Sequence, residues 1–536
     1  MTSRPLRRAA VLVAAPVLAL ATLAVLPSAP SYAAAESDPA PTRAGAAWLS
    51  RHAEGGFYPG DCSWTCQVEA ADAIETVGDP GGVLDDMRQA FARNVNGWTT
   101  FNLPDEFGDN WVTSGQGTAT AAVLGQQIGA DPAEVADVVS RLEGLLLAQG
   151  VMEGRLVDRW EAEPGTVEYD YVGVVAQAFA VTALTRAESP KATVATQWLL
   201  SQQCAGGFFS KRLSEPSAGD PSCDAGPDRA PDVPATARAL LALRAATGVP
   251  GVQEALDEGG AWLASQQRAD GSWGGDAATT GRAGQALGAL GFPAPAARAA
   301  VWVRRHQAAD PGPCVSGLAA QPGVIAPDDA TLSRARAEGL ETLHVSDWLQ
   351  TTAGAVGVLR YAPTVGTGAT VRVTDAGFRR AGARAAVGAA GLAPGTTVCA
   401  AGPGAGGALV AAGANGQALA SVRLPSGTGT RRYVLRDATG VRASYAFQVL
   451  GAARLPLKVA RGTVARGARQ QVRVRGLVPG ESVRVLLRGK RVAAGRAGRS
   501  GVFVAAFRVG GRSGKARLTA VGQFPDRTGA TTMRVR

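Results

Sequence analysis

Histidine is scarce in this sequence: the 536-residue chain has 3 histidines, together with 6 cysteines and 4 methionines. So few histidines exclude a histidine-rich metal centre. Six cysteines in so long a chain exclude a disulfide-dense scaffold, although they allow local cross-links. Charged residues make up 18% and apolar residues 46%, which excludes a wholly disordered chain. The length predicts about three or four domains.

The N-terminus has the pattern of a secretory signal peptide. Three arginines precede an apolar run from Ala9 to about Leu26, and prolines and small residues follow. We therefore assign residues 1–35 to a signal peptide and leave them out of the predicted fold. A transmembrane anchor is the alternative, but the run is short and ends in prolines. No other stretch is long and apolar enough, so we expect a secreted, extracellular protein with no membrane span in its mature form.

Charge divides the chain into two parts. Residues 361–536 hold 29 lysines and arginines against 4 acidic residues, a net charge of +25, whereas residues 1–360 hold 25 against 40, a net charge of −15. The basic part predicts binding to an anionic polymer of the cell envelope. The alternative is a general preference for arginine with no bound partner. We do not expect a nucleic acid partner, because aromatic residues are not interleaved with the basic ones.

The basic part is a tandem repeat of about 85 residues. The segment 391–395 (Gly-Leu-Ala-Pro-Gly) recurs at 476–480 (Gly-Leu-Val-Pro-Gly), and Gly416 matches Gly501 at the same offset. Short alternating or clustered Val-rich runs between Gly and Pro turns are typical of β-strands. We predict two immunoglobulin-like β-sandwiches, over 366–451 and 452–536.

The acidic part contains a helical repeat. Segments around four tryptophans each look like the end of a helix, and in three of them a glycine turn follows. A second helix rich in small residues is predicted downstream in each unit, over 68–77, 118–128, 170–184, 233–246, 280–290 and 348–360. Paired helices of this kind must bury their apolar faces on neighbouring pairs, either as an open solenoid or as a closed ring.

One motif in these repeats resembles a known family. Residues 267–273 (Gln-Arg-Ala-Asp-Gly-Ser-Trp) fit the QxxxGxW repeat of squalene cyclases, and 203–209 and 52–58 are variants of it. The chain resembles exported actinobacterial prenyltransferase/squalene-oxidase repeat proteins of the terpenoid cyclase and protein prenyltransferase superfamily. The resemblance implies an α/α toroid over 42–362, so the predicted architecture is multidomain, helical first and then β.

The resemblance also implies that the repeat residues are structural. In that family the glutamine hydrogen-bonds a neighbouring helix while the aromatic ring packs beside it. The residues assigned to this role are Trp48, Trp198, Gln203, Phe209, Trp262, Gln267, Trp273 and Trp302.

The cysteines of the helical part are disulfide candidates. Cys62 and Cys66 are close in sequence, and Cys204 and Cys223 bracket a loop-like segment, so we expect each of these two pairs to cross-link. Cys314 is expected to be a buried spare or an alternative partner for Cys204 or Cys223. Cys399 is expected to be a single buried thiol.

The sequence lacks the catalytic motifs of the family it resembles. Asp328 and Asp329 lack the first acid of the cyclase DxDD motif and predict a helix N-cap instead. The histidines are not spaced for the prenyltransferase zinc site. We therefore assign no catalytic, cofactor-binding or metal residues and no cofactor, and leave enzymatic activity open.

The densest polar and aromatic cluster is the candidate ligand-facing site: Trp160, Glu161, Glu163, Tyr169, Asp170 and Tyr171. We expect a non-catalytic toroid that binds a small apolar, isoprenoid-like ligand or an extracellular partner. One alternative is a divergent terpene cyclase, or a polysaccharide lyase with Tyr169, Tyr171 and His344 as candidate groups. Another is a structural envelope module attached through its basic domains.

Overall fold

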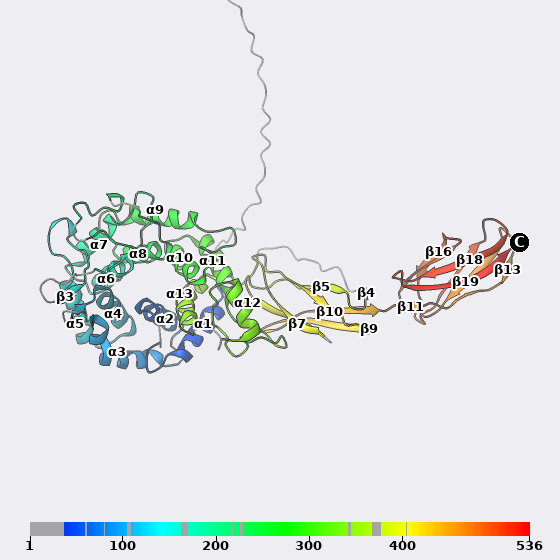
Figure 1. Ribbon diagram of the computed structural model, residues 1–536, viewed down its shortest axis with the longest axis horizontal. Helices are drawn as coiled ribbons and strands as arrows, with labels where there is room; N and C mark the ends of the chain where they lie inside the picture. The colour runs from blue at the N-terminus through cyan, green and yellow to red at the C-terminus, as the bar shows by residue number, and fades with distance from the viewer. Residues whose placement is uncertain are drawn as a thin grey trace, which may run out of the picture. The chain divides into compact units, whose positions relative to one another are not determined.

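The computed structural model describes residues 37–58, 62–79, 81–103, 109–161, 170–215, 218–225, 229–340, 345–366, 377–403 and 405–536. The predicted signal peptide lies outside these ranges. Helices extend from Ala40 to Tyr361 with one small sheet among them, and strands occupy the chain from Phe378 to Val535 (Figure 1). The predicted order of a helical part followed by a β part is therefore confirmed. Within the described residues, no helix combines the length and hydropathy that crossing a bilayer requires.

Six helices in the described part of the chain form a closed inner ring. Each packs against the next, and the last packs against the first (Figure 1). They are α2 (Trp64–Thr76), α4 (Gly115–Ile128), α6 (Val174–Arg186), α8 (Val233–Ala245), α10 (Ala277–Ala289) and α13 (Val345–Val356). All six overlap the predicted second helices of the repeat. The helix predicted from Asp170 begins only at Val174, because the segment before it is bonded to neighbouring loops instead.

Burial separates the inner helices from an outer layer. Helix α4 buries 11 of its 14 residues, whereas the outer helix α5 (Pro132–Gly144) buries 3 of its 13. Small residues let the inner helices approach closely: a Cβ added at Gly281 would lie 2.3 Å from the Cα of Ala355. The other helices outside the ring are α1 (Ala40–His52), α3 (Val83–Thr99), α7 (Ala192–Ser201), α9 (Val252–Ser265), α11 (Pro293–His306) and α12 (Asp329–Glu338).

A glycine fixes each of five loops against the next outer helix. Gly271 has a φ of +98°, and a Cβ there would lie 2.7 Å from the carbonyl oxygen of Arg298 in α11. Gly323 occupies the same place in the last loop, against Ala44 of α1. The other three are Gly56, Gly154 and Gly207. Because Gly323 contacts the first helix, the outer layer also closes on itself.

The two ends of the helical part lie side by side. The amide of Asp38 donates to the carbonyl oxygen of Ala362 at 2.8 Å, and Ser37 and Pro363 form a β-bridge. Asp38 also forms an ion pair with Arg304 at 2.7 Å. The entry and exit of this part are therefore fastened together.

Three disulfides account for all six cysteines: Cys62–Cys66, Cys204–Cys223 and Cys314–Cys399. The first two are the pairs considered from the sequence. The expectation of a spare Cys314 and a single Cys399 thiol is wrong, because the two sulfurs are bonded to each other. They lie in a small apolar cluster with Ala401. Three disulfides fit an oxidising, extracellular environment.

The third disulfide gives a direct covalent test. We expect non-reducing peptide mapping of the secreted protein to recover a Cys314 peptide joined to a Cys399 peptide, and reduction to separate them. A Cys314 peptide joined to Cys204 or Cys223 would contradict this connectivity. A Cys314→Ser/Cys399→Ser double variant is expected to lose about 2–4 kcal/mol of unfolding free energy.

The β part consists of two copies of one folding unit. In the first copy the strands are β4 (Phe378–Arg380), β5 (Arg384–Ala389), β6 (Thr397–Gly402), β7 (Ala405–Ala411), β8 (Ala418–Arg423), β9 (Gly429–Asp437) and β10 (Gly440–Leu450). In the second they are β11 (Ala453–Arg454), β12 (Leu457–Val459), β13 (Thr463–Val464), β14 (Arg469–Val474), β15 (Ser482–Leu487), β16 (Lys490–Arg496), β17 (Phe503–Arg508), β18 (Gly514–Val521) and β19 (Arg527–Val535).

The strand bounds confirm the 85-residue repeat. Strands β5 to β8 recur as β14 to β17 with both ends displaced by that number of residues. The pairing recurs too: β6 lies between β7 and β9, as β15 lies between β16 and β18. In each copy, β5 with β8, or β14 with β17, supplies a second sheet, and both sheets share one hydrophobic core.

Candidate functional site

Three glutamines join successive repeats by the same pair of hydrogen bonds. The Nε2 of Gln267 donates to the carbonyl oxygens of Gly271 and Pro295, both at 2.9 Å. Gln203 makes the same bonds to Gly207 and Ala255. In each case one acceptor lies in the glutamine's own loop and the other in the first turn of the next outer helix.

The third glutamine closes the cycle. Gln307 donates to Gly323 at 3.2 Å and to Pro41 of α1 at 2.9 Å. In the loop after α5 the amide comes instead from Gln177 of α6, which donates to Gly154 and Ala195. These side chains therefore hold the ring together and are occupied by main-chain groups.

The aromatic repeat residues pack inside the helical layers. The indole of Trp273 donates to the carbonyl oxygen of Leu263 at 2.9 Å, and that of Trp48 to the Gln321 side chain at 2.9 Å. Trp302 stacks on His306 with ring centroids 3.7 Å apart. Phe209 and Trp198 are buried, and Trp262 is half-buried. None of these residues lines a pocket among those described for the helical part.

The candidate ligand-facing cluster lies at the N-terminal ends of the inner helices α4 and α6. Trp160 and Glu161 are on β3 (Arg159–Glu161), which pairs with β2 (Trp111–Thr113), itself paired with β1 (Thr100–Asn102). Asp170 and Tyr171 follow. Glu163, Tyr169 and His344 lie outside the described residues. The acids at 328–329 form the predicted N-cap: Asp328 accepts a hydrogen bond from the Thr331 amide.

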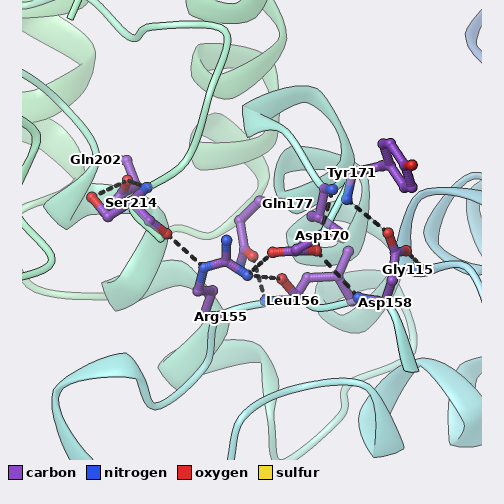
Figure 2. Close-up of polar contacts among 10 residues, drawn as sticks. Gly115, Arg155, Leu156, Asp158, Asp170, Tyr171, Gln177, Gln202 and Ser214 are labelled. Carbon is purple, nitrogen blue, oxygen red and sulfur yellow. Dashed lines mark hydrogen bonds and ion pairs between the residues drawn. The ribbon is translucent and has the colours of Figure 1, made fainter. Parts of the chain in front are cut away.

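A buried ion pair supports this cluster (Figure 2). Arg155, which is 2% exposed, pairs with Asp170 and donates its Nε to the carbonyl oxygen of Ser214 at 2.8 Å. Asp158 accepts hydrogen bonds from the amides of Gly115 at 2.7 Å and Tyr171 at 2.9 Å. Three loops are thereby tied to the start of α4. Sequence reasoning missed Arg155, since nothing in its local sequence marks it.

The Asp158 carboxyl has a structural role, as its pKa and hydrogen bonds indicate. Burial raises the pKa of its carboxyl, the two amide hydrogen bonds lower it, and the Asp170 charge raises it again, so the net shift is upward. Both of its oxygens are occupied by main-chain amides. Two aromatic side chains nearby are exposed, Tyr171 at 59% and Trp111 at 48%, as are the charged Arg159 and Glu161 of β3. Exposed aromatic rings held on a rigid support can bind an extracellular partner by stacking.

An ionic group that sequence reasoning also missed lies inside the helical ring. Glu69 of α2 accepts hydrogen bonds from Arg282 of α10 at 2.7 and 2.8 Å and from Arg238 of α8 at 2.9 Å. Arg238 also lies over the ring of Phe179, 4.6 Å from its centroid. Burial alone would raise the pKa of Glu69, but the charges and hydrogen bonds of the two arginines outweigh it, so its pKa is lowered. Glu69 is therefore ionised at neutral pH.

The second β unit presents positive charge on both of its sheets. Along β14, inward residues alternate with the exposed Arg469, Gln471 and Arg473. Two like-charged pairs lie directly opposite each other across strands: Lys458 opposite Arg473, and Arg469 opposite Arg508. The other sheet has a third such pair, Lys515 opposite Arg534. The two acidic residues of the second β unit, Glu481 and Asp526, are already paired with arginines.

No group of three or more potential metal ligands occurs among the residues that the structure describes.

No protein-family model and no curated protein matches the sequence. Among solved structures, a protein from Actinoplanes is similar over 60% of this chain and 98% of its own, with 18% identity and a TM-score of 0.38. The type II terpene cyclase MstE from Scytonema is similar over 60% of this chain and 96% of its own, with 15% identity and a TM-score of 0.38.

Other solved structures are similar to smaller parts of the chain. The adhesin InvE of Yersinia pseudotuberculosis covers 30% of this chain and 56% of its own, with 13% identity and a TM-score of 0.17.

Proposed function

We propose that this is an exported, non-catalytic binding protein that attaches to an anionic envelope polymer through its basic β part. In this proposal the helical part is an α/α toroid and the β part is two immunoglobulin-like sandwiches. The toroid presents the aromatic surface of Trp111 and Tyr171 to an extracellular partner. The observation that carries the proposal is the set of like-charged cross-strand pairs on the second β unit.

The like-charged pairs have a cost that a polyanion would remove. Like charges directly opposite across strands destabilise a sheet by roughly 0.2–1 kcal/mol a pair. In the unbound protein these pairs only destabilise the sheet. A bound polyanion would attract both members of each pair, and its counterions would be released. The exposed Arg469 and Arg473 on one face of β14 are also suited to contacting successive negative charges of a linear polymer.

The ionic group inside the ring supports a non-catalytic role. A terpene cyclase needs a carboxylic acid that can donate a proton to an alkene. Glu69 has a lowered pKa and is held by two arginines. The charged group also disfavours the wholly apolar ligand expected from the sequence. These observations favour the binding role over the cyclase.

The polymer proposal is tested by retention on two polyanions. The full secreted chain is passed over immobilised long-chain polyphosphate and wall teichoic acid, with neutral dextran as the control surface. A fourfold variant carries Lys458→Gln, Arg469→Gln, Arg473→Gln and Arg508→Gln. We expect it to elute at lower salt, with the slope of log affinity against log salt shallower by on the order of 0.7 per lost contact.

A matched variant controls for net charge. It carries Arg93→Gln, Arg212→Gln, Arg268→Gln and Arg334→Gln, all exposed in the helical part, and is expected to be retained like the wild type. Without polymer, the fourfold β variant is expected to unfold at the same or a higher temperature, since two repulsive pairs are removed. Equal retention of both variants would refute attachment through these sheet faces.

A further inference from the structure

A pocket lies inside the helical ring, at the end where the inner helices finish. Its volume is about 280 Å³. All six inner helices, with the turn Gly357–Tyr361 that follows α13, contribute to its lining. Ionic and amide side chains dominate its polar wall: Glu69, Asp72, Gln127, Arg186, Arg238, Arg244, Gln285 and Arg360. The pocket is therefore built by the whole ring and belongs to no single loop.

The acids of this pocket are already neutralised. Glu69 is held by Arg238 and Arg282. Asp72 accepts from Arg360 at 3.2 Å and from the amide of Gln285 at 3.3 Å. Four arginines line the pocket against two carboxylates, so its lining has a net positive charge.

Two of the arginines have no acid of their own. Within the described residues, neither Arg186 of α6 nor Arg244 of α8 forms an ion pair, and both are exposed. Each lies in the last turn of its helix, where a cation offsets the helix dipole. The dipole accounts for a cation at a helix end. It does not account for two such arginines lining one pocket together with Arg238 and Arg360.

From this geometry we infer that the pocket binds a compact oxyanion with two or more negative charges, such as a phosphate ester or a polycarboxylate. Arg186 and Arg244 would supply the charge-assisted hydrogen bonds at its mouth, since a guanidinium matches carboxylate and phosphate oxygens in pairs. Gln127 can donate an amide hydrogen bond from the wall. Glu69 and Asp72 hold the inner arginines in place, and the volume limits the ligand to a small molecule.

Calorimetric titration of the full secreted chain tests this site. The probes are inorganic pyrophosphate and citrate, with acetate as the singly charged control. We expect one saturable site for pyrophosphate, citrate or both, and none for acetate. An Arg186→Gln/Arg244→Gln double variant is expected to bind at least about tenfold more weakly. Stronger binding of pyrophosphate would assign the site to phosphate esters, and stronger binding of citrate would assign it to polycarboxylates.

A matched variant separates this pocket from the basic β part. Arg93→Gln/Arg334→Gln removes two exposed arginines elsewhere on the helical part and is expected to bind both probes like the wild type. All variants are expected to keep wild-type retention on polyphosphate, so a failure here would leave the polymer proposal standing. Equal probe binding by the two double variants, or no binding of either probe to the wild type, would overturn the pocket assignment.

Discussion

Replacing Glu69 by glutamine is expected to lower the free energy of unfolding of the helical part by about 3–5 kcal/mol. The substitution removes the charge that Arg238 and Arg282 share inside the ring, where the Glu69 side chain is 7% exposed. Two guanidinium groups would then be left close together without their counter-charge. Denaturant unfolding followed by tryptophan fluorescence measures this effect cleanly, because all 10 tryptophans precede residue 361.

The control for this prediction is Asp72→Asn. Asp72 is on the same helix and pairs with Arg360, but their side chains are 39% and 34% exposed. Solvent screens such a pair, so the expected loss is about 1 kcal/mol or less. Similar losses in the two variants would contradict a stabilising ionic centre.

The Glu69 interaction also predicts an acid dependence. Its pKa in the folded state is lowered from 4.5. The unfolded chain therefore takes up the proton first as the pH falls. The stability from this group is complete at neutral pH and is lost as the pH falls below about 4.5 through the folded-state pKa. In Glu69→Gln this part of the acid dependence should be absent.

Replacing Gly323 by alanine is expected to cost about 3 kcal/mol of unfolding free energy. Its φ of +98° is unfavourable for alanine, and the added Cβ would lie 1.9 Å from the carbonyl oxygen of Ala44. The first effect contributes about 1–2 kcal/mol, and displacing the α1 backbone adds about 1–3 kcal/mol. The displacement would also disturb the hydrogen bonds of Gln307 that join the last repeat to the first.

Gly274→Ala is the matched control for the closure of the ring. Gly274 has a φ of +68°, but no atom lies within 4 Å of an added Cβ. Only the conformational cost remains, so we expect a loss of about 1–2 kcal/mol. Equal losses at both positions would show that the contact between Gly323 and α1 contributes nothing to stability.

Local patterns in the sequence predicted much of the fold. The small-residue runs located all six inner helices. A helix that is buried on most of its surface is rich in small and apolar residues, and this composition can be recognised in the sequence. The repeated Gly-Leu-x-Pro-Gly segments gave the offset of the β units, since each marks a turn with glycines at positive φ, as at Gly391 and Gly476. Asp328 was predicted as a helix N-cap for a similar local reason.

The groups that the sequence did not reveal are brought together by tertiary contacts between repeats and between domains. Glu69 and Arg282 are 213 residues apart, and nothing near either residue indicates the other. The partner of Cys314 lies 85 residues away in a different kind of domain, so no spacing rule could select it. In one repeat, the two hydrogen bonds that other repeats make with a glutamine after an outer helix are made by Gln177 of the inner helix α6. Such contacts depend on which repeats meet in space, and the local pattern specifies only that repeats exist.

The bridge between Ser37 and Pro363 has a topological consequence. A cyclic array whose first and last members touch has no preferred starting point. A short peptide could link those two positions, and new termini could be opened in the turn between α10 and α11 without changing any layer of the array. The same adjacency would let the array sit as an insert within a surface loop of another protein, because its two attachment points are already as close as neighbouring strands.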